Sequence, residues 1–362
     1  MTIGERGVVL VTGGCGYVGS VVVPELLALG EQVRIVDNMW FRTAPPAHPN
    51  LEVLEGDLRR IDPAWLDGVR GVIHLAGLSN DPTADFAPHL NAEVNVQAAR
   101  RLAETTALRA RAEGREIRFV AASSCSVYYC PTRGAAEVEA QDEESLVAPV
   151  ANYSKTKRMA EMAFLDVASR HEEFCPVMLR KGTLFGLAPK MRFDLVVNAF
   201  TLHAWKKRRL TVNGSGEAWR PLLHVRDAAD AYIYCLLAPT EAVRGRIFNV
   251  SHKNYRVLEL AHWVTEVLER NRGVQVDVRR DRSSADGARS YYVLAEKISK
   301  TLGFRAEKGI TQGVLEIWDA LESGRFGDDP AADPYYFNIR WFKERGIADR
   351  EFAAAAPEPT RA

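Results

Sequence analysis

The sequence predicts an α/β fold: a doubly wound, Rossmann-like parallel sheet followed by a smaller mixed α/β domain. Short apolar segments rich in β-branched residues alternate with helical patterns through the first half of the chain, and a glycine cluster follows the first segment. Such alternation is typical of a parallel sheet covered by helices on both faces. Ligands of these sheets bind beyond the carboxyl ends of the strands, so we expect the functional site there.

The expected elements follow in order along the chain. The segment 8–11 is short and β-branched, as a buried strand should be, and the helical pattern 18–29 after it closes at Gly30. A second strand, 32–36, ends at Asp37. Further strands are expected at 51–56, 71–77, 117–122 and 176–180, and further helices at 91–114 and 153–171.

A change of composition divides the chain, whose 362 residues exceed one average domain. From about Gly186, proline, glycine, tryptophan and basic residues become frequent and the expected strands shorten. We expect a Rossmann-like domain over 1–185, a second domain over 186–350 and a disordered tail over 351–362. No internal repeat is visible.

Composition argues against several classes of function. The formal net charge is zero, which gives no field to attract nucleic acid or an anionic membrane. No stretch is long and apolar enough to span a bilayer, and no signal peptide is visible. The cysteines are odd in number and scattered, which fits a reduced, cytoplasmic chain and predicts neither disulfides nor a metal site. They are Cys15, Cys125, Cys130, Cys175 and Cys235.

The glycine cluster Thr12-Gly13-Gly14-Cys15-Gly16-Tyr17-Val18-Gly19 lies between an expected strand and an expected helix. That context favours a dinucleotide site, because glycines let the backbone approach a pyrophosphate at the positive end of the helix. The spacing of Gly13, Gly16 and Gly19 differs from the more common fingerprint. A plain strand-to-helix turn is the alternative.

Asp37 ends the second expected strand, about 20 residues past the glycines. An acid there hydrogen-bonds the ribose hydroxyl pair and repels a 2′-phosphate, which favours NAD over NADP. Arg42 lies nearby and is the residue that would offset this preference.

Tyr153 and Lys157 in Tyr153-Ser154-Lys155-Thr156-Lys157 are four residues apart on an expected helix and so share a face. A free tyrosine has a pKa of about 10, and a pKa near 7 needs roughly 4 kcal/mol of phenolate stabilisation. Lys157 and a nearby nicotinamide cation are expected to supply it, so that Tyr153 takes a hydroxyl proton while hydride passes to NAD. The hydroxyls of Ser123-Ser124, after the fifth strand, would orient the reacting oxygen.

With these motifs, the chain resembles the extended short-chain dehydrogenase/reductase family, in its NAD-dependent nucleotide-sugar epimerase/dehydratase branch. The resemblance spans about 8–343. It rests on the glycine turn, Asp37, Gly56-Asp57-Leu58, His74-Leu75-Ala76-Gly77, Asn95, Ser123-Ser124, Tyr153 to Lys157, Leu179-Arg180, Arg220 to Asp227 and Leu302-Gly303-Phe304.

The resemblance implies roles for particular residues. Ser124, Tyr153 and Lys157 would be catalytic, and Lys157 would also hold the nicotinamide ribose. The first domain would bind NAD and the second a nucleotide-diphosphate sugar, in a homodimer. The implied cofactor contacts are Gly13, Gly16, Tyr17, Val18, Gly19, Asp37, Asn38, Asp57, Leu58, Leu75, Ala76, Gly77, Asn95, Ser123, Tyr153 and Lys157. The implied substrate contacts are Ser79, Ser124, Thr183, Asn198, Arg220 and Arg289, with Arg282 a competitor of Arg289 as second phosphate clamp.

Some positions depart from the family pattern. The 4,6-dehydratases of the family carry Asp-Glu after the catalytic hydroxyl, where this chain has Cys125-Ser126. Cys125 is interpreted as a packed thiol, and Lys190 as a phosphate contact or solvated residue in preference to an extra acid/base. Lys181 replaces a usual aromatic or amide residue, and Tyr129 a usual glycine.

The leading hypothesis is therefore a 4-epimerase that works through a transient keto sugar. A nucleotide-sugar dehydratase, and a net dehydrogenase or ketoreductase on a sugar nucleotide or small alcohol, remain alternatives. A cofactor-sensing regulator is a third, from another class, although such proteins typically lose the Tyr or the Lys.

Overall fold

A parallel sheet forms the centre of the first half of the chain in the computed structural model, which describes residues 7–41, 43–129, 138–283 and 290–347. Within these residues the sheet has seven strands in the order β11-β7-β5-β4-β1-β2-β3. This confirms the predicted Rossmann-like fold. The strands are β1 (Val8–Thr12), β2 (Gln32–Asp37), β3 (Leu51–Glu55), β4 (Val69–His74), β5 (Ile117–Ser124), β7 (Phe174–Lys181) and β11 (Ile247–Val250).

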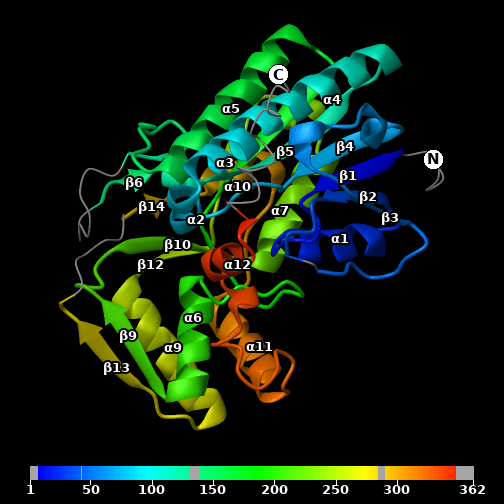
Figure 1. Ribbon diagram of the computed structural model, residues 1–362. Helices are drawn as coiled ribbons and strands as arrows, with labels where there is room; N and C mark the ends of the chain where they lie inside the picture. The colour runs from blue at the N-terminus through cyan, green and yellow to red at the C-terminus, as the bar shows by residue number, and fades with distance from the viewer. Residues whose placement is uncertain (1–6, 42, 130–137, 284–289, 348–362) are drawn as a thin grey trace, which may run out of the picture.

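Helices cover both faces of this sheet, with α4 and α5 on one side and α1 and α7 on the other (Figure 1). The expected helix 91–114 is interrupted: a π-helical segment, Glu93–Ala98, lies between two α-helices and carries the buried Asn95. Such π-bulges are frequent at functional sites. The helices of this half are α1 (Gly19–Ala28), α2 (Asp81–Phe86), α3 (Pro88–Ala92), α4 (Ala99–Glu113), α5 (Asn152–Arg170), α7 (Val225–Leu237) and α8 (Thr240–Val243).

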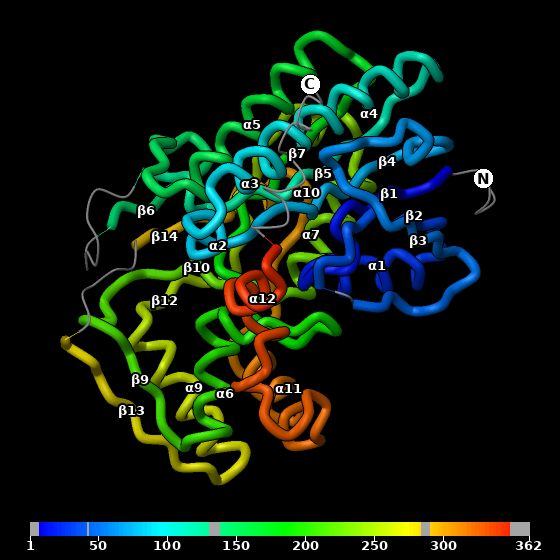
Figure 2. Tube along the Cα trace, viewed as in Figure 1, coloured from blue at the N-terminus to red at the C-terminus, as the bar shows by residue number. Residues whose placement is uncertain are grey.

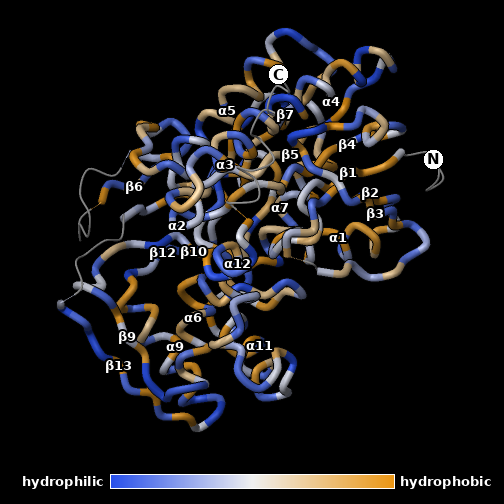
Figure 3. The backbone as a smooth tube through the Cα atoms, viewed as in Figure 1, coloured by the Kyte–Doolittle hydropathy of each residue, from blue (hydrophilic) through white to orange (hydrophobic). Residues whose placement is uncertain are grey.

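The second half has its own apolar core, in which α6 (Val196–Lys207), α9 (Val257–Arg272) and α11 (Ile310–Glu322) pack together. Figure 3 contrasts the apolar β1 with the hydrophilic edge strand β13 of this half. Its strands are β8 (Thr183–Phe185), β9 (Arg209–Asn213), β10 (Trp219–His224), β12 (Lys253–Arg256) and β13 (Asp277–Asp281). Near the junction of the two halves lie β6 (Ala140–Gln141), β14 (Tyr292–Val293) and α10 (Glu296–Leu302).

The chain crosses between the halves several times. Strand β11 comes late in the sequence and yet completes the first sheet. Helix α7, also from the later part of the chain, packs on a face of that sheet. Helix α12 (Asn338–Glu344) returns to the Rossmann-like half (Figure 2). There the Trp341 indole donates to the Trp40 carbonyl at 2.7 Å. The division after residue 185 remains an expectation. Arg42, Cys130, Arg289 and the expected disordered tail lie outside the described residues.

Candidate active site

A cavity of about 340 Å³ lies at the carboxyl ends of the sheet strands, between the two halves. It brings together most of the residues that the sequence singled out. Those that line it are Gly13, Gly16, Tyr17, Val18, Gly19, Leu75, Gly77, Ser79, Ser123, Ser124, Tyr153, Lys157 and Thr183.

The glycine turn fits a dinucleotide pyrophosphate. Gly13 has φ +74°, and a Cβ on it would lie 2.6 Å from the Ala76 nitrogen, so the fold itself requires glycine there. A Cβ on Gly19 would overlap the Gly13 carbonyl. A Cβ on Gly16 would meet only that carbonyl, at 3.4 Å, and Gly16 faces the cavity. Packing therefore leaves Gly16 as the position where the backbone is open to a phosphate.

The expected ribose and adenine contacts lie past the edge of the cavity lining. Asp37 ends β2 and accepts hydrogen bonds from the Cys15 N–H at 3.0 Å and the Met39 N–H at 2.9 Å. Its burial raises the pKa of the carboxyl. Asp57 pairs with Arg59 and caps a 3-10 turn that contains the buried Leu58. Asn38 accepts from the Trp40 N–H at 3.3 Å.

Asn95 holds the loop after β4 in place and does not line the cavity. Its side chain accepts from the Leu78 N–H at 2.8 Å and donates to the Leu78 carbonyl at 3.0 Å. A Cβ on Gly77 would lie 2.6 Å from the Asn95 Oδ1 and 3.5 Å from the Lys157 Nζ. Asn95 thus fixes the position of the Gly77–Leu78 backbone next to the ammonium of Lys157.

Tyr153 and Lys157 lie one turn apart on α5, as predicted. The Lys157 Nζ is 5.9 Å from the centroid of the Tyr153 ring and donates to the Ala122 carbonyl at 3.1 Å. Burial lowers the pKa of Lys157 to about 8. The Ser124 Oγ donates to the Ser126 Oγ at 2.9 Å, and Ser124 also hydrogen-bonds to the Tyr153 side chain.

The electrostatics of Tyr153 differ from the expectation. Burial, followed by the charge of Asp81, raises the pKa of Tyr153 to about 12, while Arg192 and the bond to Ser124 act in the lowering direction. The predicted lowering of the Tyr153 pKa by Lys157 is not the dominant effect. Burial destabilises the phenolate by more than the surrounding cations stabilise it. The pyridinium of bound NAD would add a further cation to this cavity.

A buried network fixes the strand ends below the site. Glu161 on α5 accepts from the Ser123 hydroxyl at 2.5 Å and from the Arg180 guanidinium at 2.8 and 2.9 Å. Arg180 also donates to the Tyr128 hydroxyl at 3.1 Å. The Cys125 Sγ donates to the Arg180 carbonyl at 3.1 Å, and burial raises the pKa of this thiol well above its usual range. A thiolate base at Cys125 has no support here.

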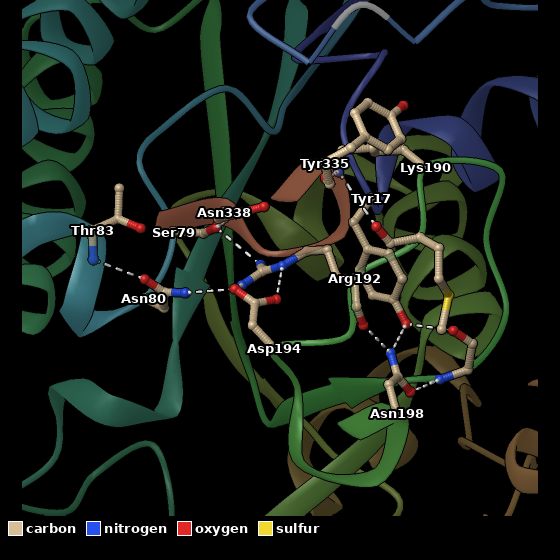
Figure 4. A network of polar contacts seen from close by, with 12 residues as sticks. Tyr17, Ser79, Asn80, Thr83, Lys190, Arg192, Asp194, Asn198, Tyr335 and Asn338 are labelled. Carbon is tan, nitrogen blue, oxygen red and sulfur yellow. Dashed lines mark hydrogen bonds and ion pairs between the residues drawn. The ribbon is translucent and has the colours of Figure 1, made fainter. Parts of the chain in front are cut away.

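Two of the expected substrate contacts lie outside the cavity lining. Asn198 is fully buried, donates to the Tyr17 hydroxyl at 3.2 Å and accepts from the Gly186 N–H at 3.0 Å (Figure 4). Arg220, on β10, lies 5.5 Å from the ring centroid of Tyr291, a residue of the lining. Arg282 is exposed.

Several lining residues escaped the sequence analysis, and Arg192 is the most consequential. Its guanidinium makes two 2.9 Å bonds to Asp194 and one 3.0 Å bond to the Ser79 Oγ (Figure 4). Lys190, which the sequence analysis did single out, also lines the cavity; it donates to the Tyr335 carbonyl at 2.6 Å, with its Nζ 4.1 Å from the Tyr335 ring centroid. Other lining residues that the sequence analysis missed include Phe41, Asp81, Tyr291 and Asn338.

Comparison with known proteins agrees with this geometry. Residues 9–251 match the model of the NAD dependent epimerase/dehydratase family. UDP-glucuronic acid decarboxylase 1 of Xenopus tropicalis is 29% identical over 240 residues, 63% of this chain and only 53% of that protein. UDP-glucose 4-epimerase of Bacillus subtilis (strain 168) is 25% identical over 86% of this chain and 95% of that protein. The structure of MoeE5 in complex with UDP-glucuronic acid and NAD aligns with TM-score 0.74 and 26% identity over 88% of this chain and all of that one.

Fold and site together define a dinucleotide-dependent enzyme whose candidate site is lined by a Tyr–Lys pair. More particularly, the chain belongs to the NAD-dependent epimerase/dehydratase family, as the resemblance implied, and NAD is its cofactor.

Proposed function

We propose that this protein is an NAD-dependent nucleotide-sugar epimerase, most simply a 4-epimerase. The observation that carries the proposal is one cavity in which Ser124, Tyr153 and Lys157 are gathered, while positions 125 and 126 are a buried thiol and a hydroxyl. The site therefore has the groups for a reversible oxidation, and its positions 125 and 126 lack the Asp-Glu pair that the 4,6-dehydratases of the family carry.

The chemistry requires little more than these residues. NAD, held at the glycine turn and beside Lys157, would supply the hydride acceptor for the sugar C4–H. Tyr153 takes the proton of the C4 hydroxyl as the ketone forms. Ser124 hydrogen-bonds to the phenol hydroxyl of Tyr153. After the keto sugar has rotated in the cavity, hydride would return to the opposite face of the ketone. Tyr153 then gives the proton back to the new C4 oxygen. Electrons and protons balance, so no added cofactor is consumed.

The charge of the cavity suits a nucleotide-diphosphate sugar. Among its described lining residues the cations are Lys157, Lys181, Lys190 and Arg192, and the carboxylate is Asp81. Asp194 pairs with Arg192. A surplus of cations fits two diphosphates, that of the cofactor and that of the substrate. We propose that Arg220 and Arg289 complete the substrate clamp, with Ser79 and Thr183 facing the sugar.

The matched relatives include a decarboxylase and a 4-epimerase of UDP sugars, and the alternatives of dehydration and net oxidation share the first step. A product assay separates them. Purified protein is incubated, without added NAD, with UDP-, GDP-, ADP-, CDP- and dTDP-sugars, and products are followed by mass spectrometry and NMR. Unchanged mass with inverted C4 stereochemistry supports the proposal. Loss of water or carbon dioxide, or release of free NADH, would replace it with the corresponding alternative.

We also propose that the protein is a cytoplasmic homodimer. The cysteines of the described residues, Cys15, Cys125, Cys175 and Cys235, are buried free thiols, which suits a reducing compartment. In the described part of the chain, no helix has the length and apolarity to cross a membrane. Exposed apolar side chains on α4 and α5 offer a self-association surface, which is tested below.

A further inference from the structure

A second, partly buried ammonium lies beside the predicted proton-transfer pair. Lys181 is the last residue of β7, and it is paired in register with Ser124 at the end of β5. Its Nζ is 3.4 Å from the Ser123 carbonyl, while the Nζ of Lys157 is 3.1 Å from the carbonyl of the preceding residue, Ala122. Two ammonium groups thus share the carbonyl end of one strand and line one cavity.

Among the described residues, Lys181 has polar partners but no carboxylate counter-ion. Its Nζ is 2.7 Å from the Tyr232 hydroxyl and 5.3 Å from the centroid of that ring. Within the described residues it makes no salt bridge to a carboxylate, unlike Arg180 one residue earlier. Burial, together with the charge of Lys157, lowers the pKa of Lys181 to about 7. The charged form is thus an uncompensated cation in a site of low dielectric.

Under the proposed function, the nicotinamide ring of NAD would lie at this end of the cavity. The hydride and the proton leave neighbouring atoms of one alcohol, so the hydride acceptor has to lie near Tyr153 and Ser124. Lys181 lines the same cavity, on the side of α7, which provides Tyr232, whereas Tyr153 and Lys157 come from α5 on the other face of the sheet.

We propose that Lys181 sets the redox balance of the bound cofactor by opposing the positive nicotinamide ring of NAD⁺ and leaving the neutral ring of NADH unaffected. A fixed cation raises the free energy of a nearby cation, so the oxidised cofactor becomes a stronger hydride acceptor. This role of Lys181 rests on the proposed function. A transient ketone has to form on the enzyme, and Lys181 would make the bound NAD⁺ a stronger oxidant for that step.

The test measures the bound cofactor and uses no sugar, so failure of the epimerase proposal would not affect it. The holoenzyme is equilibrated with a mediator dye couple of known potential at pH 6, where Lys181 is protonated, and reduced nicotinamide is read by absorbance. Lys157, Tyr232 and Cys125 also face this ammonium. Lys181→Gln keeps the hydrogen bonds without the charge, Lys181→Met removes both, and Lys181→Arg keeps the charge. Lys155→Met, at an exposed position of α5, is the matched control.

We expect the ratio of bound NADH to NAD⁺, at a fixed ambient potential, to fall about tenfold in Lys181→Gln and Lys181→Met, and to stay near wild type in Lys181→Arg and Lys155→Met. Either neutral variant suffices if the other does not fold. An unchanged ratio in the neutral variants would overturn the proposal. So would an unchanged ratio with weakened binding of nucleoside diphosphates, since Lys181 would then be a substrate contact.

Discussion

At the residue scale, burial sets the protonation of the candidate site. Tyr153, Lys157 and Lys181 all have pKa values shifted toward their neutral forms, and burial is the first cause in each case. In a buried site of low dielectric, every cation that enters shifts these pKa values. The reactivity of Tyr153 should therefore depend on its whole surroundings and not on Lys157 alone.

Tyr153→Phe removes the phenol hydroxyl and keeps the ring. We expect turnover of the nucleotide sugar to fall about 10²-fold or more, because no other described lining residue offers a hydroxyl on this helix face of α5. Bound NAD, read from the absorbance of the purified protein, should be retained. Turnover near that of the parent would remove Tyr153 from the mechanism.

Because His74 is buried in its neutral form, we expect the protein to lose stability as the pH falls. His74 ends β4, fully enclosed between Phe119 and Phe164, and its Nδ1 lies 2.8 Å from the Thr12 Oγ1. Burial lowers its pKa from 6.5 to about 3. In that window the unfolded chain binds a proton that the folded chain does not, so stability falls as pH falls from 6.5 toward 3, by about 1.4 kcal/mol per pH unit.

Urea unfolding at pH 7 and pH 5 measures this effect. From pH 7 to pH 5 the parent should lose about 2 kcal/mol more than His74→Asn, which has no imidazole to protonate. Lys157 also has a lowered pKa, but its window lies between about 8 and 10.5 and leaves this comparison untouched. Equal losses in the two proteins would contradict the assignment.

At the scale of elements, the sequence predicted the strands around the cofactor well and the substrate side poorly. The strands that end at Asp37 and Ser124 have periodic apolar patterns, and the structure places them as expected. Arg192 lies on an irregular segment before α6, where no periodicity shows which way a side chain points. Asn338 reaches the cavity from nearly the end of the chain, a long-range contact that no local pattern encodes.

The residue that binds the substrate diphosphate can be identified by comparing nucleoside diphosphate binding among arginine variants. Arg220→Ala should weaken binding of nucleoside diphosphates about ten- to a hundredfold, since a charge-assisted hydrogen bond contributes roughly 1.5–3 kcal/mol. Calorimetry with UDP and the other nucleoside diphosphates measures it, with NAD binding as reference. Arg209→Ala, at an exposed position of β9, is the control. If only Arg192→Gln weakens binding, the clamp is the Arg192 that lines the cavity.

At the scale of the whole molecule, the two halves are joined by more than one kind of contact. The Tyr17 hydroxyl, beside the glycine turn, donates to the Gly186 carbonyl at 2.6 Å, and Asn198 holds both (Figure 4). Helix α12 adds an apolar contact with Trp40 and Phe41. The cavity is therefore built from both halves at once, and neither half alone has its lining.

Self-association should use the outer surface of α4 and α5. Leu108, Met159 and Met162 are 59%, 54% and 56% exposed, and the two methionines are three residues apart and so adjacent on α5. Light scattering after size exclusion should give the mass of two chains for the parent and of one chain for Met162→Glu. Leu237→Glu, an equally exposed position on α7, should stay dimeric. A parent that runs as a single chain would contradict the proposal.

The late arrival of β11 has a consequence for synthesis on the ribosome. Strand β7 pairs with β5 on one side and with β11 on the other, yet β11 follows β7 by more than sixty residues of chain. Until those residues emerge, a nascent chain presents β7 as a long, apolar, unpaired edge, the kind of surface that invites pairing with another chain. The pairing of β11 with β7 thus both completes the seven-stranded sheet and covers this edge of the newly made protein.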